Sequence, residues 1–508
     1  MIELMIREFK QQGRTINIYN SSIVHEADSA LFLIREKYTR KLVIIYPQPK
    51  DNIARFQVEE DGQLVTEGEN LGYKICPCNH HNASLLRERF PFTCPQVMGV
   101  KPAIGTGDRI GLATPGHIRA VKEFGLFPVL AQQSIREMAR SARSPEDVMD
   151  DVTWAVFQEG HRGGFAADAD HLKTREDVDA TFKAGFTMYT IDPSDYVDDE
   201  SSRHNMGTLK EKFSDLPWDS LKSSQTDCFK RYLHRKFELT SREGSLRLEF
   251  TEEKLLRAAV KYAHAIAHVA EMNRHLEKLF KGKKFDLEIS IDETSDPTSP
   301  LEHFFITSEL HRLGVHFQGI APRFVGKFEK AIDYIGDLKE FERDLRNHVI
   351  IAKSSGYKLS VHSGSDKFSI YPILGRLARD IIHLKTAGTS YLETLRIVAR
   401  HDPRLFREIV SSSLRYFEKD RSTYFVSASI SAIPDPDKVS DKDLERTYLE
   451  IPDARQILHV TFGSILTARK DDGSFQFRDR IKRVIFDHEE EYYQTISEHI
   501  GRHIKPLE

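Results

Sequence analysis

The sequence predicts an α/β protein built on a (β/α)8 TIM-like barrel, with an N-terminal α/β extension and a C-terminal helical extension. Two observations predict this fold. From about residue 100 onward, a short apolar or alternating run, a polar loop and a helical pattern follow one another eight times. Helical patterns also separate the apolar runs, as parallel strands require. A chain of 508 residues has room for two or three compact units.

Composition narrows the class of protein. Hydrophobic residues make up 40% of the chain and charged residues 30%, which allows a large core and excludes a disordered or fibrous protein. The 73 lysines and arginines nearly balance the 77 aspartates and glutamates, so the net charge at pH 7 is −4. Such a chain has no overall field for nucleic acid or an anionic membrane, and we expect neither partner.

Four cysteines cannot form a disulfide framework in a chain of this length, and the first residues lack the pattern of an export signal. We therefore expect a cytoplasmic location. No run approaches about 18 apolar residues, so we expect no membrane-spanning helix.

Three parts of the chain are predicted from these patterns. Residues 1–95 alternate short β-like runs with charged turns and predict a small α/β domain. Residues 96–400 hold the repeating units and predict the catalytic barrel. The repeating strand–loop–helix pattern is interrupted at about 196–245 by a charged stretch, which indicates an insertion after the fourth strand. A long amphipathic helix is expected over 251–280. Residues 401–508 are mostly helical in pattern and predict an extension packed on the barrel.

The eight predicted strands each run into a polar loop. In a (β/α)8 barrel the active site lies at the carboxyl ends of the strands, so functional residues are expected in these loops. In chain order the strands end at Gly105-Thr106-Gly107-Asp108, Ala131-Gln132-Gln133-Ser134, Ala167-Asp168-Ala169-Asp170-His171, Thr190-Ile191-Asp192-Pro193, Ser290-Ile291-Asp292-Glu293, Ile320-Ala321-Pro322-Arg323, Val361-His362-Ser363-Gly364 and His383-Leu384-Lys385-Thr386.

In three of these strands, aliphatic and polar residues alternate, and this pattern indicates which polar side chains face the barrel interior. In the run 285–292, the odd positions from 287 onward are aliphatic, whereas Glu288, Ser290 and Asp292 share the opposite face. Because the aliphatic face of a barrel strand packs on the outer helices, we expect these polar residues to point into the barrel interior. The alternative is an antiparallel sheet with one solvated face.

The same alternation places Ser360 and His362 on the inner face of one later strand, and His383 and Lys385 on that of another. A carboxylate buried beside them costs several kcal/mol unless a metal or a counter-charge offsets the lost hydration. The sequence therefore predicts a metal or catalytic cluster. Lys385 could instead form a Schiff base with a carbonyl substrate, or bind an anion.

The loops resemble those of the tagaturonate epimerase family over nearly the whole chain. The resemblance is weakest before residue 95 and in the charged insertion. The motifs that carry it are Gly105-Thr106-Gly107-Asp108-Arg109, Ala131-Gln132-Gln133-Ser134, Phe157-Gln158-Glu159-Gly160, Ala167-Asp168-Ala169-Asp170-His171, Phe186–Asp195, Asp292-Glu293-Thr294, Pro297-Thr298-Ser299-Pro300, His362-Ser363-Gly364-Ser365-Asp366-Lys367-Phe368 and Lys385-Thr386-Ala387-Gly388-Thr389-Ser390-Tyr391.

This resemblance implies a cytoplasmic, divalent-metal-dependent enzyme that interconverts D-tagaturonate and D-fructuronate at C4 in hexuronate catabolism. Matched residue by residue, it implies Asp170 as proton acceptor and Glu288 as proton donor. It also implies His171, Glu329 and His362 as metal ligands. Two imidazoles and a carboxylate leave coordination positions open, and Zn, Ni, Mn or Co could fit.

The position of the reacting carbon limits the mechanism. C4, counted from the hydroxymethyl end, is one bond beyond the carbon activated by the C2 ketone, so removal of its proton would leave an unstabilised carbanion. Deprotonation of the C4 hydroxyl instead allows the C3–C4 bond to break in a retro-aldol step, after which the aldehyde fragment turns and adds again. Asp170 and Glu288 are expected to exchange the proton from opposite sides. A hydride shift through a C4 ketone is the competing route.

A sugar acid also needs a cation for its carboxylate. Lys367 and Lys385 rank first, because their loops supply further hydrogen-bond donors. The full set of expected substrate contacts is Lys367, Lys385, His383, Asp292, Arg323, Arg109 and Gln132.

Other functions stay open at this point. The chain could be an aldolase or isomerase of a related ketose or keto acid, with or without a Lys385 imine, or an epimerase of neutral ketohexoses such as tagatose and fructose. It could also be a non-catalytic sugar-acid sensor. The oligomeric state is open, and a homo-oligomer is one option.

Overall fold

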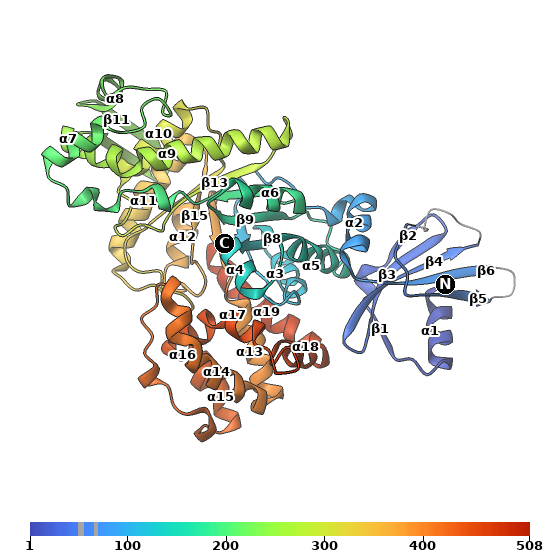
Figure 1. Ribbon diagram of the computed structural model, residues 1–508. Coiled ribbons are helices and arrows are strands. Elements are labelled where there is room, and N and C mark those ends of the chain that lie inside the picture. The colour runs from blue at the N-terminus through green and yellow to red at the C-terminus, as the bar shows by residue number, and fades with distance from the viewer. Residues whose placement is uncertain (49–54, 66–69) are drawn as a thin grey trace.

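Eight parallel strands close into a barrel in the computed structural model, which describes residues 1–48, 55–65 and 70–508 (Figure 1). Each strand pairs with two neighbours, and the last strand pairs with the first. The barrel therefore has no free edge. In chain order the strands are β7 (Ala103–Gly105), β8 (Phe127–Ser134), β9 (Ala166–Leu172), β10 (Met188–Ile191), β13 (Asp286–Ile291), β14 (Gly319–Pro322), β15 (Lys358–Val361) and β16 (Ile382–Lys385).

The predicted (β/α)8 barrel is confirmed, and each predicted strand end falls at the carboxyl end of one barrel strand. The alternation in β13 holds as well. Leu287 and Ile289 pack in the main hydrophobic core, whereas Glu288 and Ser290 are buried on the opposite side of the strand. The parallel pairing of β13 with β10 and β14 excludes the antiparallel alternative.

Helices cover the outside of the barrel, and the local sequence explains where several of them begin. Ser144, Thr174 and Ser299 form capping boxes at the starts of α5, α6 and α10. Thr251 caps α9, which confirms the predicted long amphipathic helix. The helices that follow the barrel strands are α3 (Thr114–Lys122), α4 (Ile135–Ser141), α5 (Pro145–Gln158), α6 (Arg175–Ala184), α9 (Glu252–Phe280), α10 (Pro300–Arg312), α11 (Leu338–Ser355), α12 (Tyr371–Ala378) and α13 (Ser390–His401).

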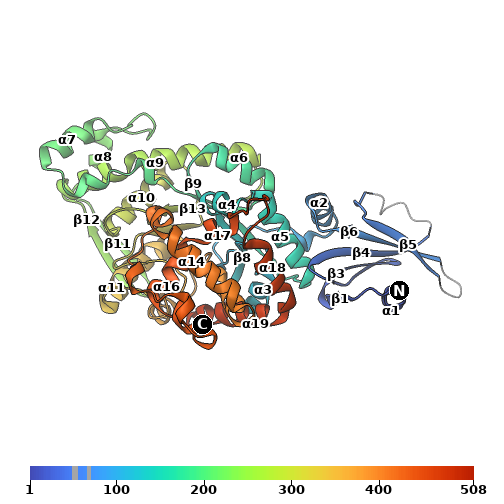
Figure 2. The same ribbon diagram turned by 60° about the horizontal axis from the view of Figure 1, so that its bottom comes forward.

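The charged stretch between β10 and α9 folds into helices and a β-hairpin at the opposite end of the molecule from the N-terminal sheet (Figures 1 and 2). Tyr232 packs its ring against Phe250 and against Phe305 of α10, so this stretch shares the main core. Its elements are α7 (Met206–Ser214), α8 (Gln225–Tyr232), β11 (Lys236–Ser241) and β12 (Gly244–Glu249).

An antiparallel sheet precedes the barrel and projects from its side (Figures 1 and 2). Met5 and Phe9 of α1 pack on one face of this sheet. On the other face, Leu31 and Leu33 pack with α2 and with Phe157 of α5, which joins the sheet to the barrel. The described elements are α1 (Ile2–Gln11), β1 (Ile16–Ile18), β2 (Val24–Glu26), β3 (Ser29–Glu36), β4 (Thr39–Pro47), β5 (Glu60–Val65), β6 (Asn70–Pro77) and α2 (His80–Arg89).

The C-terminal helices pack on the barrel helices and reach the mouth of the barrel. Helix α19 lies against α3 at Gly116, where a Cβ would come within 2.7 Å of Ile496 Cβ, so only glycine permits this approach. The Arg109 guanidinium lies over the ring of Phe462 in α17. These helices are α14 (Pro403–Asp420), α15 (Leu444–Leu449), α16 (Pro452–Val460), α17 (Phe462–Thr467), α18 (Arg478–Asp487) and α19 (Glu489–Ile504).

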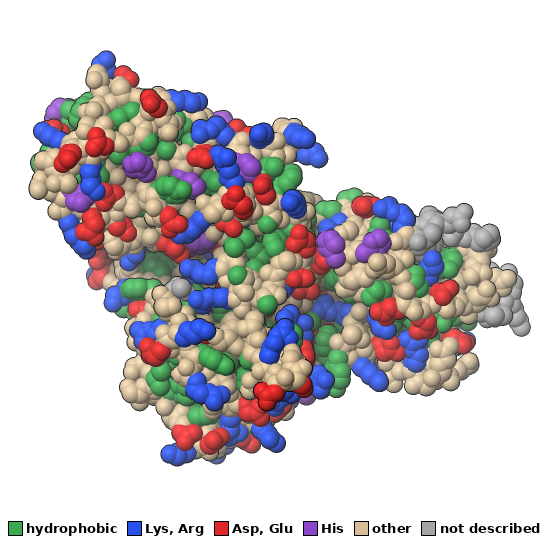
Figure 3. All heavy atoms as spheres, viewed as in Figure 1, with side chains coloured by type: hydrophobic (Ala, Val, Ile, Leu, Met, Phe, Trp, Pro, Cys, Tyr) green, Lys and Arg blue, Asp and Glu red, His purple; other side chains and the backbone are tan. Residues whose placement is uncertain are grey.

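The surface agrees with the balanced composition. Acidic and basic side chains are interspersed over the face seen in Figure 3, and neither sign forms an extended patch there. Among the helices that the structure describes, none combines the length and hydropathy needed to cross a bilayer.

Candidate active site

A cavity opens at the carboxyl ends of the barrel strands. Polar side chains dominate its lining, so it suits a small ligand with many hydroxyl groups. The C-terminal part of the chain contributes Tyr424 and His459 to the wall. The lining residues are Arg109, Gln132, Ser134, Arg136, Glu137, Asp170, His171, Asp292, Glu293, Lys330, Ala331, His362, Ser363, Ser365, Lys385, Ala387, Gly388, Tyr424 and His459.

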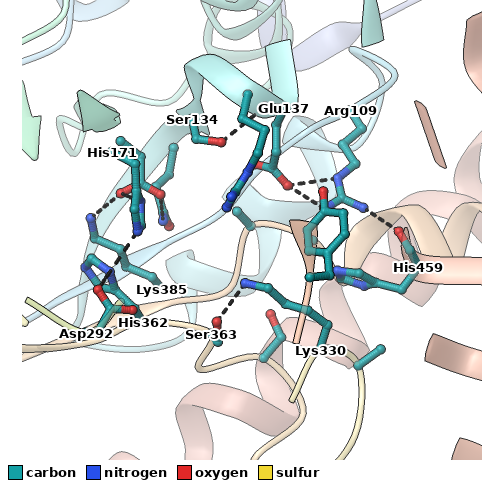
Figure 4. Close-up of a pocket in the computed structure, with 18 of the residues that line it drawn as sticks. Arg109, Ser134, Glu137, His171, Asp292, Lys330, His362, Ser363, Lys385 and His459 are labelled. Atoms are coloured by element: carbon teal, nitrogen blue, oxygen red, sulfur yellow. Dashed lines mark hydrogen bonds and ion pairs between the residues drawn. The ribbon is translucent and has the colours of Figure 1, made fainter. Parts of the chain in front are cut away.

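Two imidazoles and two carboxylates meet on one wall of this cavity (Figure 4). One possible ligand atom each from Asp170, His171 and His362 lies within 4.8 Å of the others. His171 Nδ1 is 2.9 Å from Asp170 Oδ1, and His362 Nδ1 is 3.0 Å from Asp292 Oδ1. His171 has a backbone φ of 54°, a strained value for a residue with a side chain, and such strain often accompanies functional sites.

A buried carboxylate beneath the cavity, that of Glu288, orients the ring of His362. Its Nε2 lies 2.9 Å from Glu288 Oε1. Its Nδ1 is buried and, among the described residues, has no partner with hydrogen-bond geometry, although Asp292 Oδ1 is close. A histidine held at one ring nitrogen by a carboxylate, with the other nitrogen directed at a second carboxylate, is the arrangement seen around metal ligands.

Charge and burial set the ionisation of this cluster. Burial alone would lower the pKa of His171, but Asp170, Asp292 and Glu293 raise it to about 10. Burial would raise the pKa of Asp170, but the positive charges of His171 and Lys385 hold that pKa well below its usual range. Without a metal, the cluster therefore pairs ionised carboxylates with a protonated imidazole at neutral pH.

Lys385 lies beneath the cluster and is surrounded by acids. Its Nζ is 2.8 Å from a carboxylate oxygen of Asp168, of Asp170 and of Glu288, and it donates to Thr190 Oγ1 at 2.9 Å. Burial would lower the pKa of Lys385, but the three carboxylates raise it well above its usual value. The amine is therefore protonated and fully engaged, which disfavours both an imine and a contact with the substrate carboxylate.

Glu288, the predicted proton donor, is buried and is not part of the cavity lining. Its carboxylate contacts His362, Lys385, Ser360 and, at 3.1 Å, His383 Nδ1. Burial would raise its pKa, but Lys385 and His383 hold the pKa well below its usual range. An ionised acid beneath the cavity can position His362. Its role as donor stays a prediction, as does the substrate contact of His383, which also lies outside the lining.

Glu329, the third predicted ligand, does not join the cluster in this structure. Its Oε2 accepts hydrogen bonds from Ser427 N at 3.0 Å, Ser427 Oγ at 2.6 Å and Gln456 Nε2 at 2.9 Å. The residue lies in the loop after β14, where that loop meets the C-terminal helices. Its carboxylate ties the two together, and its ligand role stays a prediction.

The other predicted substrate contacts divide into two groups. Gln132 and Asp292 line the cavity, and so does Arg109, whose guanidinium is paired with Glu137. The remaining two lie outside this lining. Lys367 Nζ donates to three backbone carbonyls at 2.6–2.9 Å, and burial lowers its pKa to about 7. The Arg323 guanidinium bonds a backbone carbonyl and lines an adjoining cavity.

Several lining residues are not among the predicted site residues, and the sequence gives a signal for only some of them. Lys330 directly follows Glu329 in a loop already under consideration, and Ser134 and Arg136 follow the Gln132 strand end. Tyr424 and His459 come from the C-terminal helical part. No motif in the sequence places these last two at the mouth of the barrel.

Comparison with known proteins gives a consistent result. A sequence model of a tagaturonate epimerase family matches residues 19–507. A tagaturonate/fructuronate epimerase of Thermotoga maritima is 41% identical over 508 residues, covering 99% of this chain and all of that protein.

Solved structures of a protein with the same activity in its name are also similar to this chain. The crystal structure of a fructuronate-tagaturonate epimerase of Cohnella laeviribosi complexed with glycerol is 38% identical, with a TM-score of 0.90 over 99% of this chain and 98% of that one. The native crystal structure of that protein gives a TM-score of 0.88 over the same shares of the two chains.

Proposed function

Because this chain belongs to the tagaturonate epimerase family and is thus an isomerase-class epimerase, we propose that it interconverts D-tagaturonate and D-fructuronate at C4 with the help of a divalent metal. This would be a step of hexuronate catabolism in the cytoplasm. The observation that supports the proposal most is the cluster of Asp170, His171 and His362 on the wall of a polar cavity at the barrel mouth.

The donor set of the cluster fits a divalent cation. His171 and His362 offer imidazole nitrogens, and Asp170 and Asp292 offer carboxylate oxygens within reach of those rings. The buried His362 Nδ1 lies 3.0 Å from Asp292 Oδ1, a separation that two ligands of one ion would also have. Nitrogen and oxygen donors of this kind suit Zn, Ni, Mn or Co. When bound there, the cation would stabilise negative charge that develops on the ketose oxygens.

Asp170 is the candidate proton acceptor. Its Oδ1 contacts Lys385 and His171, while its Oδ2 has one long contact, 3.4 Å, from Gln132 Nε2. It would take the proton of the C4 hydroxyl while the C3–C4 bond breaks. The C4–O bond then becomes a carbonyl, and the electron pair of the broken bond moves onto the C2–C3 unit. After the aldehyde turns, the bond forms again on its other face and the proton returns to the C4 oxygen.

The proposal is tested by incubating the metal-loaded protein with D-fructuronate in D2O and following the product by NMR. We expect D-tagaturonate to appear without deuterium at C4, because a retro-aldol route never breaks the C4–H bond. Deuterium at C4 would contradict the retro-aldol route and indicate that the proton is removed directly from carbon. Absence of tagaturonate would contradict the proposed function.

A further inference from the structure

Lys330 lies on the cavity wall, and its amine forms no ion pair with any described residue. It lies in the loop after β14, and its Nζ donates one hydrogen bond, 2.7 Å long, to Ser363 Oγ. Within the described part of the chain, no carboxylate oxygen lies within 4.0 Å of this Nζ. An ammonium has three protons to donate, so two remain for another partner.

Three of the four other cations expected as substrate contacts are engaged within the protein, and the fourth, Arg323, lies outside this lining and bonds a backbone carbonyl. Lys385 is balanced by three carboxylates, and Arg109 is paired with Glu137. Lys367 donates to three backbone carbonyls outside the lining. Burying an unpaired charge is costly, so the cavity is more favourable for an anion beside Lys330 than for a neutral group.

Arg136 strengthens the positive character of the same region. It lines both this cavity and the adjoining one, as Lys330 does. Its guanidinium lies 3.4 Å from Glu293 and 5.6 Å from the centre of the Tyr424 ring, and its buried Nε has no hydrogen-bond partner among the described residues. Lys330 and Arg136 carry like charges that face the same space, so an anion bound between them would offset their repulsion.

The positions in the cavity suit the two ends of a sugar acid. In Figure 4 the Lys330 amine lies toward the middle of the pocket, with His171, His362 and Asp292 to one side and Arg109 and His459 to the other. The ketone at C2 and the carboxylate at C6 lie on opposite sides of the reacting C4. A chain whose ketose oxygens face the imidazole cluster would therefore direct its carboxylate away from that cluster, toward Lys330.

We propose that Lys330, with Arg136 beside it, binds the carboxylate of the substrate and so selects sugar acids over neutral ketoses. This inference rests on the proposed function, because that function identifies the sugar. It does not require that the protein turns the sugar over. If the C3–C4 bond breaks, the carboxylate is on the aldehyde fragment. The same contact would then retain that fragment while it turns.

The test compares the affinities of two sugars for the metal-loaded protein by calorimetry, with D-fructuronate as the acid and D-fructose as its neutral analogue. Lys330→Met should weaken D-fructuronate binding about 10- to 100-fold, the value of a hydrogen bond to a charged group. Fructose binding should change less than about threefold. Lys327→Met is the matched control, since Lys327 is exposed, lies on the same loop and lines only the adjoining cavity.

The outcomes separate the two proposals. Fructuronate binding within about twofold of wild type in Lys330→Met would overturn the carboxylate site, as would an equal loss for both sugars or a larger loss in Lys327→Met. Tight fructuronate binding by the wild-type protein without turnover would count against the proposed function and leave the carboxylate site standing.

Discussion

Asp170→Asn should lower the turnover of D-fructuronate by about 10²- to 10⁴-fold, the range expected when a positioned acid or base is removed. The substitution keeps the size of the side chain but replaces the basic carboxylate by an amide, which cannot take the C4 hydroxyl proton. The rate should be measured at saturating substrate and with excess metal, so that weaker metal binding does not contribute. Turnover within tenfold of wild type would assign the proton transfer to another group.

Glu288→Gln is the matched comparison for Asp170→Asn. Both changes remove one negative charge that lies 2.8 Å from Lys385 Nζ, but only Asp170 lines the cavity. If Glu288 acts by orienting His362, its loss should weaken metal affinity about 10- to 100-fold, and excess metal should restore most of the rate. A loss that metal does not restore would favour the predicted proton-donor role of Glu288.

Lys385→Met should reduce the free energy of unfolding by about 3–5 kcal/mol, because it leaves three buried carboxylates without their shared counter-charge. Urea titration followed by circular dichroism measures the change. The expected loss is at the upper end for a single substitution.

Lys358→Met is the control for this prediction. Lys358 is buried on the neighbouring strand β15, but its Nζ has no hydrogen-bond partner among the described residues, and burial lowers its pKa to about 8. Replacing an unpaired buried amine by an apolar side chain of similar length should be neutral or stabilising. If both substitutions reduce the free energy of unfolding equally, the charge of Lys385 does not stabilise the three carboxylates around it, and the prediction is wrong.

The barrel could be predicted from the sequence because its signals are local. The alternation of aliphatic and polar residues in β13 fixes which side chains face inward, and this put Glu288 inside the barrel before any contact was known. Strand ends are likewise marked by polar loops. The same signals identified His362 and Lys385 as inward residues, and both line the cavity.

The sequence does not predict which inward residues line the cavity and which lie beneath it. Alternation gives the face of a strand but not the depth along the barrel axis. Glu288 lies within β13, four residues before Asp292, which directly follows that strand. Glu288 is therefore deeper in the barrel, where it contacts His362 and Lys385. Depth depends on how the eight strands are staggered, and that is a property of the closed barrel.

Long-range contacts explain the remaining differences. The loop motif around Glu329 gave no indication that Ser427 and Gln456, about a hundred residues away, would bind its carboxylate. The donors in its loop favour Lys367 as a carboxylate-binding residue, but the loop folds so that its amine donates to backbone carbonyls. In both cases the partner of a charged group is set by packing between distant segments.

Chelation shows whether the reaction depends on a bound divalent metal. The purified protein should be treated with a strong chelator, freed of it, and assayed with D-fructuronate before and after addition of Mn, Ni, Co or Zn. We predict that the chelated protein forms no tagaturonate and that at least one of these ions restores the rate at about one ion per chain. Full turnover by protein shown to contain no metal would contradict the account.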